Sequence, residues 1–214
     1  MDNFHIGRYR WPSFGLALTL LVLVVLNPMD PMNGEIGHLI EQTEWTGGIQ
    51  IEETVKIYSV LKSHRNDLDE SSAWTIAKTT LEESKKHSLD PMLVLAIIKV
   101  ESRFQHLAVS PVGARGLMQI RPFVASALVP EVDLETWHGI ESLDDPVLNI
   151  KIGVFYLSRL KKRFRDMKLT LTAYNWGPTK IRNRLAEKGV IPLGYAMKVL
   201  STYRFYSQNP PENP

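Results

Sequence analysis

The chain has 214 residues, of which 44% are hydrophobic and 22% are charged, as expected for a globular protein with one domain of about 150 residues and additional segments. Its formal net charge of +2 is too small to indicate a nucleic-acid-binding protein. It contains no cysteine, which excludes disulfides, thiolate metal sites, cysteine nucleophiles and a lipid anchor attached through cysteine.

An uncharged apolar run occupies residues 14–26, with Arg8 and Arg10 before it and Pro28 after it. A positive flank, an apolar run and a helix breaker are typical of an export signal or a membrane anchor, with the N-terminus inside. We therefore predict a hydrophobic N-terminal helix as a signal or anchor segment over residues 1–27. Since no pair of small residues marks a cleavage site, we favour an uncleaved anchor over a cleaved signal peptide.

Residues 28–50 contain proline, glycine, asparagine and threonine with little periodicity, so we predict a linker there. Apolar side chains then recur at helical spacing, first over residues 51–61 and again after a cap at Ser71 or Ser72. We therefore predict that the globular domain spans residues 51–210.

The most hydrophobic predicted helix begins at Asp90 and Pro91, a side-chain cap followed by a proline in the first helical position. The segment MLVLAIIKV follows and is apolar nearly all round, which predicts burial on most sides. The helix ends at Glu101, and burial would raise the pKa of this carboxyl and suit it to donate a proton near neutral pH. The alternative is a surface salt bridge from Glu101 to Lys99 or Arg103.

The rest of the domain is also predicted to be helical. Asp145 and Pro146 begin another helix, and the patterns over residues 168–187 and 194–206 predict more. Only residues 117–120 could form a short strand, so the predicted fold class is mainly α.

A loop is predicted over residues 108–122, where Gly113 and Gly116 permit close approach of the backbone to a ligand. The amide of Gln119 could bond a sugar hydroxyl or an acetamido group. For Met118, packing in the core is the alternative to a place in a binding cleft.

Four blocks of the sequence form a recognisable series: ESRF at 101–104, AVSPVGARGLMQIRP at 108–122, DPVLNIKIGVFYL at 145–157 and AYNWGP at 173–178. In this order and spacing they resemble the soluble lytic transglycosylase family of lysozyme-like enzymes, over roughly residues 73–206. The resemblance implies a lysozyme-like helical domain that has little or no sheet, although the superfamily is of the α+β type.

The resemblance also implies the residues of the site. Glu101 matches the catalytic glutamate of the family. The residues that match its substrate-binding positions are Ser110, Met118, Gln119, Tyr174, Asn175 and Tyr195. Two positions depart from the family pattern: His106 stands where an asparagine or proline is usual, and Trp176 replaces a small residue. Trp176 could stack on a sugar ring or narrow a subsite, and simple packing is the alternative.

The reaction implied by the resemblance is cleavage of the MurNAc-β-1,4-GlcNAc bond of peptidoglycan with formation of 1,6-anhydro-MurNAc. Most glycosidases use two carboxylates, and substrate-assisted enzymes dispense with the second. Asp144 and Asp145 are the nearest acidic residues downstream, and Asp145 is better explained as a helix cap, so Glu101 is predicted to be the sole general acid/base. The alternatives are a lysozyme-type hydrolase on the same fold and a non-catalytic envelope scaffold that binds glycan.

The predicted ligand is therefore the glycan strand, and neither a metal nor a cofactor is expected, because the sequence has no HExxH or EF-hand pattern. The basic run over residues 159–168 is either a solvated helix end or a surface attracted to acidic stem peptides, wall polymers or anionic lipids. The expected location is the periplasmic face of the inner membrane. The sequence does not distinguish general wall turnover from a dedicated role in a secretion or conjugation machine, with an envelope protein as partner.

Overall fold

The computed structural model describes residues 31–65, 67–132, 134 and 136–209, and for residues 31–47 it describes the backbone alone. The predicted signal or anchor segment at 1–27 lies outside these residues. Within the described part of the chain, no helix combines the length and apolar character that a membrane span requires. The chain divides into two compact units between Gln50 and Ile51.

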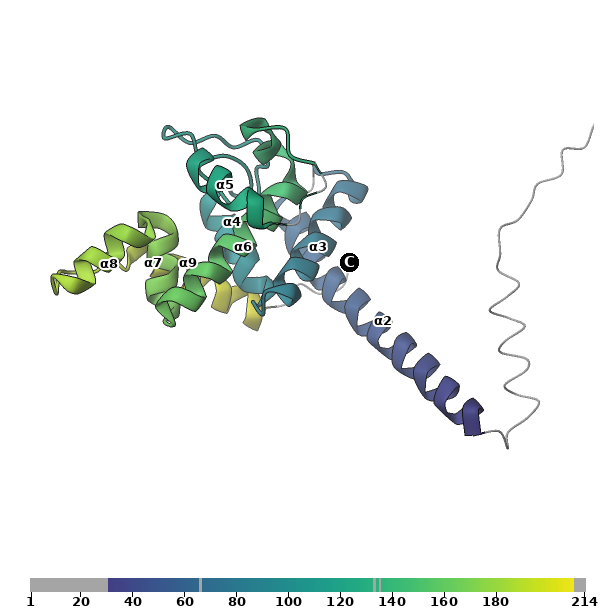
Figure 1. The fold of residues 1–214 in the computed structure, drawn as a ribbon. Coiled ribbons are helices and arrows are strands. Elements are labelled where there is room, and N and C mark those ends of the chain that lie inside the picture. Colours follow the sequence, from purple (N-terminus) through teal and green to yellow (C-terminus); the bar gives the residue numbers. More distant parts are fainter. Residues whose placement is uncertain (1–30, 66, 133, 135, 210–214) are drawn as a thin grey trace, which may run out of the picture. The chain divides into compact units, whose positions relative to one another are not determined.

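The first unit contributes the beginning of helix α2 (Pro31–His64), so residues 31–50, which we predicted as a linker, are helical. The linker and domain bounds remain predictions. The second unit holds the end of α2 and the other helices (Figure 1): α3 (Glu70–Lys86), α4 (Pro91–Glu101), α5 (Pro122–Leu128), α6 (Pro146–Phe164), α7 (Met167–Trp176), α8 (Pro178–Ala186) and α9 (Gly194–Gln208). Two 3-10 turns, η1 (Val129–Glu131) and η2 (Ile140–Asp144), lie between α5 and α6.

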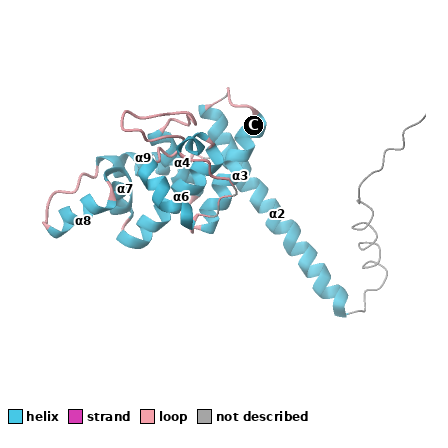
Figure 2. Ribbon diagram, turned by 45° about the horizontal axis from the view of Figure 1, so that its top comes forward, coloured by secondary structure: helices cyan, strands magenta, loops and turns pink. Residues whose placement is uncertain are grey.

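The predicted mainly-α class without a sheet is confirmed. In the described ranges, β-type pairing is limited to isolated bridges that Arg115 makes with Val109 and with Ile120, and Figure 2 shows helices and loops there but no strand. The short strand considered for residues 117–120 is thus reduced to one of these bridges.

Helix α4 lies at the centre of the second unit and packs against α3 and α9. The Asp90 carboxylate accepts a hydrogen bond from the Met92 backbone N–H at 2.8 Å, and Pro91 follows the cap, as predicted. Every side chain from Leu93 to Ile98 is buried. A helix that is buried on nearly all sides holds the residue at its end in a fixed position, and that residue is Glu101.

The loop between α4 and α5 is fixed by the side chain of Asn149 on α6, which is completely buried. Its Oδ1 accepts a hydrogen bond from Met118 N at 2.8 Å, and its Nδ2 donates to Arg115 O and Leu143 O, both at 2.9 Å. A Cβ at Gly116, where φ is +78°, would collide with this amide. The glycine is therefore required both by its backbone conformation and by the close approach of Asn149.

The last turn of α2 is joined to α9 and to α4 by polar contacts of His64. The Tyr206 hydroxyl lies 2.8 Å from His64 Nε2, and Lys99 Nζ lies 3.2 Å from His64 Nδ1. His64 also stacks on Phe104, with ring centroids 5.0 Å apart. The last turn of α2 thus belongs to the packed unit.

One local prediction was wrong, and one short helix was not predicted. Helix α3 is capped by Asp69, whose carboxylate accepts from Ser72 N at 2.9 Å, and not by Ser71 or Ser72. An aspartate three residues before the N–H is as good a cap as serine, and the sequence pattern alone did not distinguish them. Helix α5 was not predicted, because its seven residues are too few to show a helical period.

We predict that Asn149→Ala lowers the free energy of unfolding by roughly 2 kcal/mol or more, since it leaves Met118 N and Leu143 O without a partner, while Arg115 O keeps its hydrogen bond from Ile120 N. The change can be measured by urea denaturation. Asn183→Ala, at an exposed position of α8, is the matched control and should change stability by less than about 0.5 kcal/mol. Equal effects of the two substitutions would contradict the role given to Asn149.

Candidate active site

Glu101, the last residue of α4, faces Tyr195 in the first turn of α9. The Tyr195 hydroxyl donates a hydrogen bond of 2.6 Å to Glu101 Oε1. In the described residues Glu101 makes no salt bridge, and Lys99 contacts His64 instead. The alternative prediction, a surface ion pair of Glu101 with Lys99 or Arg103, is therefore wrong for the described residues.

Burial of the carboxyl raises the pKa of Glu101 from 4.5 to about 7. The hydrogen bond from Tyr195 and the positive charge of Lys198 both favour the carboxylate and lower this pKa, but by less than burial raises it. At neutral pH the protonated and ionised forms are then both populated, so Glu101 can give up a proton and take one back.

Tyr174, on α7, lies beside this pair. Its hydroxyl donates a hydrogen bond of 2.8 Å to the backbone oxygen of Met118, and its ring lies 5.3 Å from that of Tyr156. Burial raises the pKa of Tyr174 well above 10, and the charge of Glu101 raises it further. Tyr174 is therefore a neutral phenol whose proton is already engaged and whose oxygen can still accept.

Ser110 and Gln119 hold the loop between α4 and α5 in shape. Ser110 Oγ accepts a hydrogen bond from Ala114 N at 3.0 Å. Gln119 Nε2 donates to Ala108 O at 2.9 Å and to Gly116 O at 3.0 Å. The amide hydrogens of Gln119 are thus taken by the backbone, which leaves its carbonyl oxygen for a ligand.

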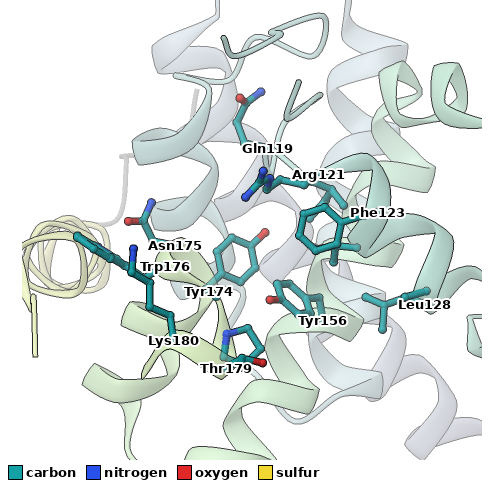
Figure 3. A pocket seen from close by; sticks show the side chains of 15 residues that line it. Gln119, Arg121, Phe123, Leu128, Tyr156, Tyr174, Asn175, Trp176, Thr179 and Lys180 are labelled. Carbon is teal, nitrogen blue, oxygen red and sulfur yellow. The ribbon is translucent and has the colours of Figure 1, made fainter. Parts of the chain in front are cut away.

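A cavity of about 440 Å³ opens next to Tyr174 and is shown in Figure 3. Its walls come from the end of the loop and from helices α5 to α8. The residues that line it are Gln119, Ile120, Arg121, Phe123, Val124, Ala127, Leu128, Tyr156, Tyr174, Asn175, Trp176, Gly177, Pro178, Thr179 and Lys180. Glu101 does not line this cavity; Tyr174 lines it, and the charge of Glu101 raises the pKa of Tyr174, so the carboxyl lies within electrostatic range of the cavity wall.

The structure brings three of the predicted site residues, Gln119, Tyr174 and Asn175, to this cavity. Glu101 and Tyr195 form the neighbouring pair, while Ser110 lies in the loop and does not line the cavity. The side chain of Met118 is completely buried, and a Cβ at Gly153 would collide with it. The side chain of Met118 therefore packs in the core, which was the alternative prediction. Its backbone oxygen contacts the site by accepting the Tyr174 hydrogen bond.

Sequence reasoning did not single out Arg121, Phe123, Tyr156 or Lys180. Tyr156 belongs to the third sequence block, at a position one would assign to the core. Lys180 lies on α8 and Trp176 ends α7, with Gly177 between the two helices, so no helical spacing in the sequence indicated that they meet.

The acidic residues downstream are engaged elsewhere. Asp144 forms an ion pair with Arg115, including a hydrogen bond of 3.0 Å from Arg115 Nε. Asp145 caps α6 by accepting from Val147 N at 2.8 Å and Leu148 N at 3.0 Å, as predicted. Neither carboxylate belongs to the site around Glu101.

The sequence profile of the family described as "Transglycosylase SLT domain" matches residues 78–190. The soluble lytic murein transglycosylase of Salmonella typhimurium is 37% identical over 94 residues, which cover 44% of this chain and 15% of that protein. Membrane-bound lytic murein transglycosylase C of Mannheimia succiniciproducens is 28% identical over 187 residues, which cover 86% of this chain and 49% of that protein. The chain therefore spans less than half the length of these relatives.

Solved structures are similar as well. An inactive mutant of the lytic transglycosylase Slt from Pseudomonas aeruginosa superimposes with a TM-score of 0.53 and 29% identity, over 63% of this chain and 24% of the other. The complex of a 70-kDa soluble lytic transglycosylase with bulgecin A has a TM-score of 0.57 at 24% identity, over 66% of this chain and 26% of that one, which supports the fold alone.

We predict that Glu101→Gln stabilises the protein at pH 8 but not at pH 4. The folded pKa of about 7 lies above the ordinary 4.5, so the neutral carboxyl favours folding below pH 4.5, and this contribution is lost as the pH rises through 7. Glutamine stays neutral, so the gain at pH 8 should approach about 3 kcal/mol in urea denaturation. Glu187→Gln, at an exposed position, is the control. A gain for Glu101→Gln that does not change with pH would contradict the assigned cause.

Proposed function

This chain belongs to the transglycosylase SLT domain family, and we propose that it is a peptidoglycan lytic transglycosylase in which Glu101 is the sole general acid/base. The observation that carries the proposal is the partly buried Glu101 carboxyl, with a pKa of about 7, held by Tyr195 beside a cavity. The family match agrees with the resemblance drawn from the four sequence blocks.

The first step is cleavage of the bond between MurNAc C1 and the oxygen of GlcNAc. Protonated Glu101 donates its proton to that oxygen, which leaves with the bonding electrons. Positive charge develops at C1, and the acetamido oxygen of the same MurNAc stabilises it, as in substrate-assisted glycosidases. A neighbouring carboxylate is then unnecessary, in agreement with the engagement of Asp144 and Asp145 elsewhere.

Tyr174 and Ser110 can orient the acetamido group, because each has one hydrogen-bonding capacity left. The Tyr174 proton is donated to Met118 O, so its oxygen is available to accept from the acetamido N–H. Ser110 Oγ already accepts from Ala114 N, so its hydroxyl proton is available to donate.

The second step closes the ring. Glu101, now a carboxylate, removes the proton from the MurNAc 6-hydroxyl, and O6 forms a bond to C1. The product is a 1,6-anhydro end, Glu101 is protonated again, and no water is consumed. The reaction is an intramolecular transglycosylation in which O6 replaces the GlcNAc oxygen at C1, and a raised glutamate pKa suits both proton transfers.

We also propose that the enzyme acts on the periplasmic side of the inner membrane. The support is the apolar segment preceded by Arg8 and Arg10, together with a relative that is named membrane-bound. A partner from a secretion or conjugation machine would fit an anchored enzyme, and this proposal rests on the sequence alone.

The direct test digests peptidoglycan sacculi with the full-length protein and weighs the released fragments by mass spectrometry. We expect fragments that lack one water at the muramic end from the wild type, and at least a thousandfold slower release from Glu101→Gln, because the proton donor is lost. Reducing ends would contradict the transglycosylase and point to a hydrolase. Unchanged release by Glu101→Gln would overturn its catalytic role.

We further predict that kcat/KM falls as the pH rises through about 7, since the first step requires protonated Glu101. Tyr195→Phe should move this fall to higher pH, because the hydrogen bond that favours the carboxylate is removed. Tyr203→Phe is the matched control on α9: its hydroxyl bonds Asp90 at 2.6 Å, and its pH profile should be that of the wild type. An unshifted profile in Tyr195→Phe would refute the coupling.

A further inference from the structure

The turn directly after Glu101 has an uncommon backbone. Arg103 and Phe104 follow the end of α4, and their φ angles are +52° and +65°. Neither residue is a glycine, and the left-handed region is unfavourable for residues that carry a Cβ. Two such residues in succession persist only where surrounding contacts hold them. The contacts that hold this turn therefore bear on the carboxyl next to it.

Arg65, the residue after α2, holds the backbone of this turn. Its Nη1 donates a hydrogen bond of 3.0 Å to Phe104 O, across 39 positions of sequence. Its Nε and Nη2 donate to the Asp67 carboxylate at 2.7 and 2.9 Å. A carboxylate that takes two donors fixes the plane of a guanidinium, so the third nitrogen is directed at the turn. The contact is thus built by two residues together.

His64, the last residue of α2, holds the side chain of the same turn. The buried ring of Phe104 stacks on the His64 ring, with centroids 5.0 Å apart. Because the Lys99 ammonium has only donors, His64 Nδ1 accepts from it at 3.2 Å. The other nitrogen, Nε2, then carries the proton and donates it to the Tyr206 oxygen at 2.8 Å. Contacts from α4 and α9 therefore fix the ring on which Phe104 rests.

Glu101 lies between two positions that the end of α2 contacts. Lys99 precedes it by two residues and Phe104 follows it by three, and both contact His64. Burial is the largest cause of the raised pKa of Glu101, and it depends on how the turn holds the carboxyl. The titratable groups that interact with this carboxyl from other helices are Tyr195, Lys198 and Tyr174.

The residues that hold the turn come from outside the segment that matches the family. That segment begins at residue 78, whereas His64 and Arg65 precede it. Phe104 lies inside it, in the first of the four sequence blocks. Displacement of the end of α2 would therefore release a turn that belongs to the matched domain and adjoins its reactive carboxyl.

We propose that Arg65, supported by His64, is a positioning residue: it holds the turn after Glu101, so that proton transfer by this carboxyl depends on the docked end of α2. This inference rests on the proposed function and adds control of its acid/base by a helix outside the matched segment. Without the Arg65 contact the turn relaxes and water reaches the carboxyl, which loses both its placement and part of its burial.

A contact of the same kind, outside the candidate site, supplies a matched control. Lys161 Nζ donates a hydrogen bond of 2.8 Å to Ser88 O, and Ser88 follows α3 with a φ of +52°. Lys161 does not line the cavity beside Tyr174. Lys161→Met and Arg65→Met each remove a cation from the backbone oxygen of a left-handed residue after a helix. Both can lower stability, and only Arg65→Met acts on the turn after Glu101.

The test uses the full-length protein and the variants Arg65→Met, Asp67→Ala and Lys161→Met. Asp67→Ala is the milder change, because Asp67 is exposed and acts on the turn only by fixing the guanidinium. One readout is kcat and KM for soluble peptidoglycan strands as a function of pH. The other is the pKa of Glu101 from carbon NMR, with Glu101→Gln to assign the signal, and this readout does not require activity.

We expect Arg65→Met to lower kcat about tenfold and to change KM by less than about twofold, because a small misplacement of a reacting group is costly. The pKa of Glu101, and with it the fall of kcat/KM, should move to lower pH by about one unit, since water favours the carboxylate. Asp67→Ala should shift both in the same direction by less, and Lys161→Met should match the wild type.

An unshifted pKa of Glu101 in Arg65→Met, or the same shift in Lys161→Met, would overturn the inference, because the Arg65 contact would then serve stability alone. If Arg65→Met does not fold, an unshifted pKa in Asp67→Ala overturns it. If the wild type cuts no strand, it is the proposed function that fails, and the NMR titration still decides whether Arg65 positions the carboxyl.

Discussion

The buried amide of Asn149 is the constraint on which the site depends. Through one acceptor and two donor contacts it fixes the backbone at Met118, Arg115 and Leu143. Met118 O in turn accepts a hydrogen bond from the Tyr174 hydroxyl, and Tyr174 lines the cavity within electrostatic range of Glu101. A single side chain on α6 therefore determines where the loop can place the groups that would orient a sugar. Loops usually vary in position, and this one is held as firmly as a core element.

The pKa of the Glu101 carboxyl depends on a balance between two opposing effects. The packing of α4 withdraws Glu101 from water, which raises its pKa, while Tyr195 and Lys198 favour the ionised form. Burial alone would keep the group protonated and unable to act as a base, and a fully exposed carboxyl would be ionised and unable to act as an acid. The contact with Tyr195 joins α9 to α4, so the pKa depends on how these two helices pack.

The sequence was informative where structure follows from local rules. The starts at Asp90 and Asp145 were predicted, because a cap followed by proline acts within one turn. The bond between Tyr195 and Glu101 joins residues 94 positions apart, and no local pattern pairs them, although the family resemblance named both residues. The complete burial of Met118 depends on the absence of a side chain at Gly153, which no local pattern reveals. The cations at Arg121 and Lys180 were overlooked because, in sequence, they resemble any exposed basic residue.

The helices that carry the candidate catalytic groups and the helix that forms part of the cavity wall differ in how extensively they are packed. Glu101, Tyr174 and Tyr195 lie on helices α4, α7 and α9, which pack against one another or share the core, so their geometry changes little without loss of stability. Lys180 and Arg184 lie on α8, which contributes one buried side chain and packs chiefly against α7. Substitutions on α8 therefore cost little folding free energy. The helices that carry Glu101, Tyr174 and Tyr195 are therefore constrained by the core, whereas the part of the cavity wall formed by α8 can change at little cost to folding.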